Sequence, residues 1–312
     1  MSRKRWFIGF AALFLLLGGV AEADDEEPTS WSVGVRTWMT GGYTKWNFQG
    51  AGISPLSELR WRGTDAVIVE GNADFVWKEL VLMTSLGAGK VTDAVLIDDD
   101  FLLSDHQGRF SHTRSSVDDE GVFFFNADAG WRAGSWRSGK SEALGYVDVF
   151  LGYQYWTEEY VAFGAVGGGP GLLSASIPSS TKALTHDYTW HSLRVGTRAQ
   201  IPIVAGLSAR ATAVLLPYNH TELEDIHHLR TDLKQNPSFS SEADGGVGFQ
   251  LDAGLSYQVW EGLSIEGGYQ FWRIDSGQGD KFTHALTGTT KDTLNQILVE
   301  RGGPYLGLRY RF

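Results

Sequence analysis

The chain has 312 residues, with 26 basic and 37 acidic side chains and a formal net charge of -11. An acidic chain is a poor partner for nucleic acid, whose phosphates are bound by Lys and Arg, and the absence of cysteine excludes disulfides and thiol chemistry. The 39 glycines and an aromatic share of 13% are typical of an all-β protein, since glycine averages about 7% of residues.

The N-terminus has the pattern of a secretory signal peptide. A basic stretch at residues 3–5 precedes an almost wholly apolar segment at 6–17, and Ala21-Glu22-Ala23 provides small residues for cleavage. An uncleaved anchor would need about 20 apolar residues, and this segment is shorter. We therefore expect a signal peptide at 1–23 and a mature chain at 24–312, whose charge is -13 after the loss of Arg3, Lys4, Arg5 and Glu22 from a chain of -11.

Apolar and polar residues then alternate with the period of two that is typical of strands. The last segment illustrates the pattern, because Leu306, Leu308, Tyr310 and Phe312 occupy every second position. The ten segments are 33–39, the stretch from 59, 80–91, 122–131, 146–155, 189–203, 207–216, 247–260, 263–274 and 305–312. An even number of such strands, one face for lipid and one for the interior, predicts a ten-stranded antiparallel transmembrane β-barrel in the bacterial outer membrane, with membrane lipid as a partner.

The connections alternate in length. Short ones are expected near 77–79, 134–141, 204–206 and 261–262, and long polar ones near 43–55, 97–118, 163–186, 225–245 and 276–295. This asymmetry predicts short periplasmic turns and long extracellular loops that face the cell exterior. Tryptophan is abundant, and we expect interfacial girdles and strand packing from Trp38, Trp46, Trp61, Trp77, Trp131, Trp156, Trp190, Trp260 and Trp272.

Two polar motifs lie where strands three and seven end. Asp98 and Asp100 are two residues apart, so they share a strand face, and their repulsion favours retention of a proton near neutral pH. Asp225 and His227 have the same spacing, and a carboxylate beside an imidazole makes it a better general base. In a ten-stranded barrel the two pairs would face each other across the mouth.

Other interpretations of these residues remain open. Both motifs are also compatible with solvated polar loops or a weak cation site. A divalent metal would draw on His227 and His228 together with Asp98 and Asp100. A lipid hydrolase would instead use His112 or His191 with a nearby serine.

The chain also resembles the omptins, the outer-membrane aspartate/histidine proteases, over about residues 50–312. The segments that carry this resemblance are Ser57-x-Leu59-x-Trp61, Leu96-Ile97-Asp98-Asp99-Asp100-Phe101, Gly130-Trp131, Gly152-Tyr153-Gln154 and Asp225-x-His227. The resemblance implies that Asp225 and His227 form a catalytic dyad and that Asp98 and Asp100 hold the attacking water. Polypeptides would be the substrates, hydrolysed without a covalent intermediate and without a cofactor.

The chain departs from the omptin pattern at several positions. Leu223 and the stretch Thr44 to Trp46 stand where omptins have acidic groups that select basic residues, so only Glu222 and Glu224 could replace them. Tyr155 and Thr157 stand where omptins have charged residues for lipopolysaccharide, and such dependence is not supported here. The alternative function is a non-catalytic barrel of the same shape, acting as an adhesin, porin or structural protein.

Overall fold

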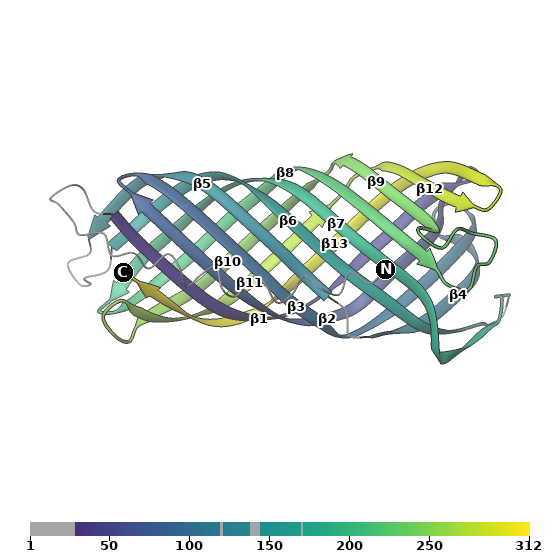
Figure 1. Ribbon diagram of the computed structural model, residues 1–312, viewed down its shortest axis with the longest axis horizontal. Coiled ribbons are helices and arrows are strands. Elements are labelled where there is room, and N and C mark those ends of the chain that lie inside the picture. The colour runs from purple at the N-terminus through teal and green to yellow at the C-terminus, as the bar shows by residue number, and fades with distance from the viewer. Residues whose placement is uncertain (1–28, 119–120, 138–143, 170) are drawn as a thin grey trace.

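A computed structural model describes residues 29–118, 121–137, 144–169 and 171–312, so the predicted signal peptide at 1–23 lies outside the described residues. Figure 1 shows tilted strands that wrap around a long axis. Ten of them form a closed ring in which each pair of neighbours is antiparallel. They are β1 (Thr29–Gly50), β2 (Ile53–Trp77), β3 (Leu80–Leu103), β5 (Gly121–Arg137), β6 (Leu144–Gly167), β7 (Ala175–Val204), β8 (Leu207–His227), β10 (Val247–Gln258), β11 (Leu263–Asp275) and β13 (Gly288–Arg311).

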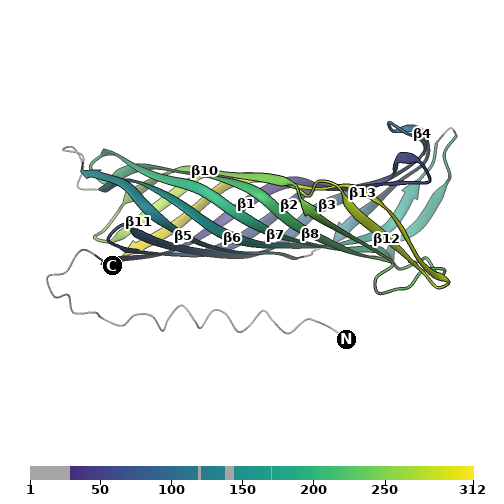
Figure 2. The same ribbon diagram turned by 90° about the horizontal axis from the view of Figure 1, so that it is seen from above.

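Three shorter strands prolong this ring at one end. β4 (Gln107–Asp118) joins β3 to β6 beyond β5, while β9 (Phe239–Gly245) and β12 (Gly279–Ala285) fill the gap between β8 and β13 beyond β10 and β11. Figure 2 shows β4 and β12 at the end opposite the C-terminus. We call this the far end, and the end with Thr29 and Phe312 the terminal end.

Most of the segments that were predicted to be long extracellular loops are therefore strands instead. Most of 43–55, 97–118, 163–186 and 276–295 is strand, and β9 occupies the end of 225–245. The ladder hydrogen bonds continue beyond the lipid-facing zone, but the apolar alternation does not, because the outer face there is polar. The terminal turns near 78–79, 205–206 and 259–262 agree with the prediction, whereas 138–143 lies outside the described residues.

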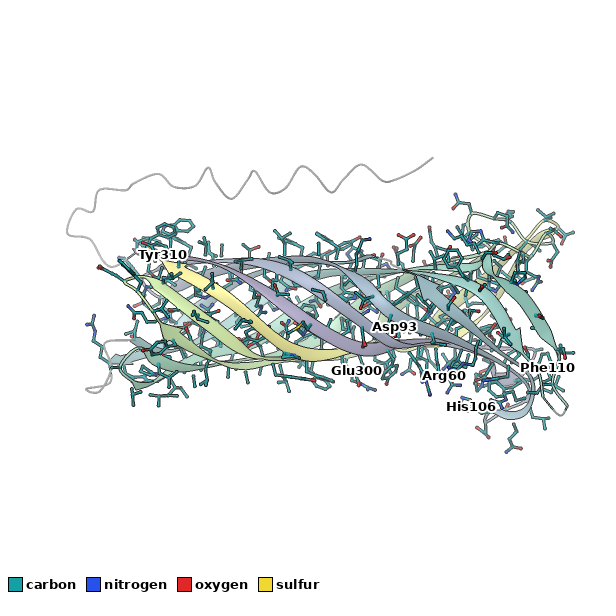
Figure 3. The ribbon with its side chains drawn as sticks, turned by 90° about the horizontal axis from the view of Figure 1, so that it is seen from below. Arg60, Asp93, His106, Phe110, Glu300 and Tyr310 are labelled. Carbon is teal, nitrogen blue, oxygen red and sulfur yellow. The ribbon has the colours of Figure 1, made fainter. Side chains whose placement is uncertain are left out.

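An apolar belt surrounds the terminal half of the barrel. Leu151 is 55% exposed and Leu308 47%, and every strand of the closed ring contributes such residues, among them Val35, Val69, Leu82, Phe125, Leu193, Leu215, Leu251 and Ile265. Soluble proteins rarely expose a continuous apolar surface of this extent, which is typical of a lipid-facing wall. In Figure 3, Tyr310 lies at the terminal end, whereas His106 and Phe110 lie at the far end. No helix in the described ranges is long and apolar enough to span a membrane.

The predicted tryptophan girdle is correct only in part. Trp77, Trp131 and Trp260 are exposed near the terminal turns, as are Trp31 and Trp136. The other six tryptophans of the prediction are buried in the barrel, namely Trp38, Trp46, Trp61, Trp156, Trp190 and Trp272. Their positions have the inward phase of the strand alternation, so these residues fill the interior.

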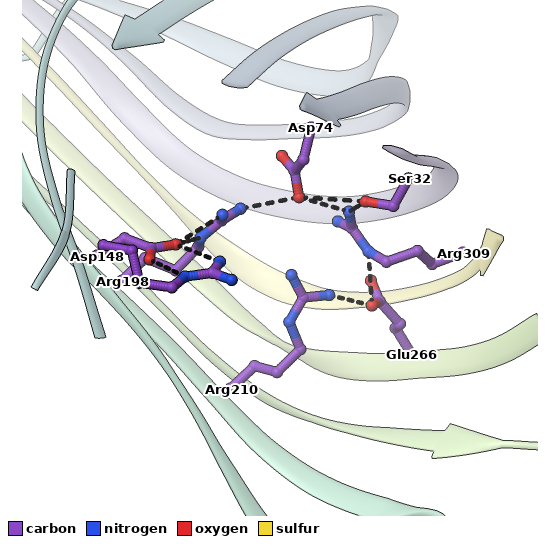
Figure 4. Close-up of polar contacts among 8 residues, drawn as sticks. Ser32, Asp74, Asp148, Arg198, Arg210, Glu266 and Arg309 are labelled. Atoms are coloured by element: carbon purple, nitrogen blue, oxygen red, sulfur yellow. Dashed lines mark hydrogen bonds and ion pairs between the residues drawn. The ribbon is translucent and has the colours of Figure 1, made fainter. Parts of the chain in front are cut away.

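The interior has two layers. Toward the terminal end, Arg132, Asp148, Arg198, Asp74, Arg309, Glu266 and Arg210 form a chain of ion pairs of alternating charge, most of which Figure 4 shows. Beyond it lies the aromatic core, where Trp156 stacks on Phe124 and Trp61 on Tyr160, with ring centroids 5.7 and 4.8 Å apart. Because the rings are closely packed, they provide a rigid floor for residues at the far end.

Candidate active site

The aspartate–histidine pair lies on the inner face of β8, at the end of the strand. Nδ1 of His227 is 2.8 Å from Oδ1 of Asp225, which is fully buried, while the His227 side chain remains 26% exposed. The backbone is fixed by Ser238, whose Oγ accepts the His227 amide at 3.0 Å and whose own amide donates to the Asp225 carbonyl at 2.7 Å. Because Asp225 occupies Nδ1, the nitrogen of His227 that is available to a substrate is Nε2.

The acidic pair lies on β3, in register with β2 and β4. Asp98 is opposite Leu59 and Thr113, whereas Asp100 is opposite Ser57 and Ser111. Oδ1 of Asp98 is buried and has no hydrogen-bond partner among the described residues. An unpartnered buried carboxylate oxygen is costly, so this atom is available to a ligand.

The middle residue of the three aspartates lies on the opposite face. Asp99 is fully buried on the outer side of the wall, where its Oδ1 lies 2.6 Å from Nδ1 of His112 and 3.1 Å from Nη1 of Arg109. Arg60 forms a further ion pair with it. The alternation of the strand therefore separates the inward pair Asp98 and Asp100 from a structural aspartate.

The two pairs influence each other's protonation. Burial and the charge of Asp100 raise the pKa of Asp98 to about 7, although His227 opposes this change. Burial also raises the pKa of Asp100, against hydrogen bonds from Ser57. Burial lowers the pKa of His227, but Asp225 and Asp98 more than offset it, so the net direction is upward. Burial disfavours ionisation of Asp225, yet His227 and a second imidazole lower its pKa to about 2.

These interactions cross the barrel mouth. At the far end the ring runs β3, β4, β6, β7 and β8 in one direction, and β3, β2, β1, β13, β12, β9 and β8 in the other. Asp98 and His227 therefore stand on opposing walls, near enough for their charges to interact. The structure brings all four predicted residues to one site.

Two residues of this site were not anticipated from the sequence. His186 on β7 lies in register with Asp225, and its Nε2 is 2.9 Å from Oδ2. Lys281 on β12 places Nζ 4.0 Å from the ring centre of Phe48 and 4.5 Å from that of Phe239. Burial lowers the pKa of Lys281, while Asp292 and Asp225 oppose the change, and its Nζ pairs with Asp292 at 3.2 Å.

The positions expected to select basic residues carry no inward acid. Leu223 is 1% exposed and Thr44 is fully buried, and the Thr44 hydroxyl donates to Glu158 at 3.0 Å. Glu222 and Glu224 alternate with Leu223 and are exposed on the outer face, where Glu222 contacts His220 at 3.2 Å. Neither glutamate replaces the missing acids on the inner face of the barrel mouth.

The other interpretations have less support from the geometry. In the part of the chain that is described, no group of three or more His, Asp or Glu side chains is arranged to hold a metal ion. His228 lies on the face opposite His227, 2.9 Å from Thr185 Oγ1. The nearest partners of His112 and His191 are Asp99 and the Tyr153 hydroxyl, each at 2.6 Å, and not a serine.

Comparison with known proteins gives a fold. No family model matches the chain, and no curated protein sequence matches it. Among solved structures, the chain is similar to the outer membrane protease OmpT from Escherichia coli, with 13% identity and a TM-score of 0.77 over 91% of this chain and 97% of that one. The translocator domain of the autotransporter NalP from Neisseria meningitidis shares 11% identity, with a TM-score of 0.39 over 92% and 90%. The shared architecture with OmpT is that of an outer-membrane β-barrel.

Proposed function

We propose that this protein is an omptin-like endopeptidase of the bacterial outer membrane. The observation that supports this proposal best is the meeting of the Asp225–His227 pair and the Asp98–Asp100 pair at one mouth, with charges that interact. General acid–base chemistry needs groups whose pKa values lie near the working pH. A buried carboxyl with a pKa of about 7 and a partly exposed imidazole with a raised pKa meet this need.

The chemistry follows from the available atoms. Nε2 of His227 takes a proton from water, and the hydroxide oxygen attacks the peptide carbonyl carbon. The Asp225 carboxylate holds Nδ1 and stabilises the imidazolium, while Asp98 and Asp100 position the water from the opposite wall. When the C–N bond breaks, the imidazolium returns the proton to the leaving nitrogen, so that no covalent enzyme intermediate forms.

The apolar belt supports the location. The belt lies in the terminal half, whereas Asp98 and His227 lie beyond it at the far end. In the outer membrane such a barrel would hold its site above the lipid, with the far end toward the cell exterior, where polypeptides can reach it.

A non-catalytic barrel is the alternative, and the interior argues against its porin form. The ion-pair chain and the aromatic core fill the cross-section, and the cavity between them, lined by Arg36, Gln250 and Trp272, has a volume of only about 130 Å³. A porin requires a continuous aqueous channel. An adhesin or structural protein would not need the Asp98–His227 arrangement.

The test is cleavage of a mixed peptide library by the folded barrel in detergent, with and without lipopolysaccharide, with products identified by mass spectrometry. His227→Ala is compared with His220→Ala, because His220 also contacts carboxylates but lies on the outer face of β8. We expect cleavage by the parent and by His220→Ala, and none by His227→Ala. Absence of cleavage by a folded parent in every condition would favour the binding or structural alternative.

A further inference from the structure

The Asp225 carboxylate is shared by two histidines. Oδ1 contacts Nδ1 of His227 at 2.8 Å, and Oδ2 lies 2.9 Å from Nε2 of His186. This second contact is close but not aligned as a hydrogen bond, and neither His186 Nε2 nor Asp225 Oδ2 has a hydrogen-bond partner among the described groups. Both side chains are fully buried, so each depends on the other for compensation.

A chain of hydrogen bonds sets the direction of the protons. Nε1 of Trp61 can only donate, and it lies 3.1 Å from the Tyr188 hydroxyl. That hydroxyl lies 2.8 Å from Nδ1 of His186. An ionised carboxylate can only accept, so the close contact with Asp225 favours hydrogen on Nε2 of His186. The Tyr188 hydroxyl keeps its proton and donates a hydrogen bond to Nδ1, which carries no hydrogen, so that His186 is a neutral imidazole.

Aromatic rings hold His186 in place. The rings packed against it are those of Trp46, Trp61 and Tyr188, with centroids 5.9, 5.4 and 5.4 Å away. The titratable groups that face it are Asp225 from β8 and Tyr188 from its own strand, with Tyr160 behind Tyr188 at 6.0 Å between centroids. Because these rings are closely packed, the imidazole has little freedom to move away from Asp225.

On the basis of the proposed function, we propose that His186 is a positioning residue of the hydrolytic site, which holds Asp225 in place by its close contact with Oδ2 and is itself held by the hydrogen bonds that begin at Trp61. It does not touch substrate, because it is fully buried. As a neutral neighbour it leaves the negative charge of Asp225 for His227, whose Nε2 remains free of Asp225.

The test uses three variants of the full chain. His186→Leu removes the hydrogen bond with Tyr188 and the contact with Asp225. His186→Gln keeps an acceptor for Tyr188 and a donor for Asp225 at a similar separation, and it cannot titrate. Tyr188→Phe removes only the donor to Nδ1. Folding of each is checked by its migration on gels before and after heating.

We expect His186→Leu to lower kcat by about 10- to 100-fold, the range seen when a group that orients a functional residue is lost, with KM unchanged. The acid limb of the pH–rate profile should move to higher pH, because an Asp225 that has lost a donor attracts the His227 proton more strongly. His186→Gln should have the kcat and the acid limb of the parent. A His186→Leu variant with the parent's kcat and pH profile, or a folded His186→Gln variant as impaired as His186→Leu, would overturn the proposal.

A measurement without turnover separates this inference from the proposed function. NMR of histidine-labelled protein in detergent, assigned with His186→Gln and His227→Ala, reports the tautomer of His186. We expect hydrogen on Nε2 of His186 and none on Nδ1. Hydrogen on Nδ1 would contradict the inference, whereas an inactive parent with the expected tautomer would refute only the protease.

Discussion

The carboxyl group of Asp98 and the imidazole of His227 belong to opposing walls of the barrel, yet each charge shifts the pKa of the other. Asp98→Asn should therefore lower the pKa of His227, because a nearby negative charge favours the imidazolium. NMR titration of His227 measures this change. Asp244→Asn is the matched control, since Asp244 contacts His220 on the outer face, and it should leave His227 unchanged. Equal effects of the two substitutions would show that the walls do not interact.

Asp98 should also reduce the stability of the barrel. Its pKa rises from 3.8 to about 7 in the folded protein. Ionisation of Asp98 therefore begins to lower the free energy of unfolding when the pH rises above the unfolded pKa, and this loss is complete above the folded pKa. Asp98→Asn should increase the free energy of unfolding by about 2–4 kcal/mol at pH 8 and change it little at pH 4. Urea unfolding in detergent provides the measurement.

Asp99→Asn is the control for this stability effect. Asp99 is fully buried but contacts His112, Arg109 and Arg60, so neutralisation should destabilise the barrel at pH 8. If both substitutions changed stability in the same direction, burial of Asp98 as an unpartnered acid would be refuted.

The apolar belt predicts a contrast between two leucines. Leu151 and Leu173 are similarly exposed, at 55% and 63%, but Leu151 lies in the belt of β6 and Leu173 near the far end. Leu151→Arg should lower the free energy of unfolding in lipid by about 2–4 kcal/mol, and Leu173→Arg should stay within about 0.5 kcal/mol of the parent. Tolerance of arginine at Leu151 would contradict the lipid-facing assignment.

The missing acids predict the cleavage preference. Leu223 lies on the inner face of β8, two residues before Asp225, and the nearby Lys281 is already paired with Asp292. The parent should show no preference for basic residues at the cut site, whereas Leu223→Asp should raise kcat/KM for an arginine peptide relative to its alanine counterpart. Competition between the two peptides measures this ratio. A parent that already prefers arginine would show that another group supplies the negative charge.

The sequence pattern predicts the closed ring of strands and the shared face of each candidate pair, because both follow from the two-residue period. The length of chain per strand also indicates that the strands extend beyond the membrane, but the pattern does not locate these extensions, because no lipid imposes apolar alternation there. The irregularities between Leu193 and Val195 and between Pro202 and Val204 cancel, so β7 and β8 pair at His186 and Asp225 in the register set by their turn. Counting back from that turn would therefore have paired His186 with Asp225, although a lone histidine in the sequence gives no sign of such a role.

The most direct test of the central claim is a double-mutant cycle of kcat/KM on one cleaved peptide, with Asp98→Ala, His227→Ala and both together. If both residues act on the same water, each single substitution should lower kcat/KM by about 10²–10⁴-fold. The kcat/KM of the double variant should then be only slightly below that of the less active single variant. Losses that multiply, or a His227→Ala variant that cleaves as fast as the parent, would contradict hydrolysis between these two walls.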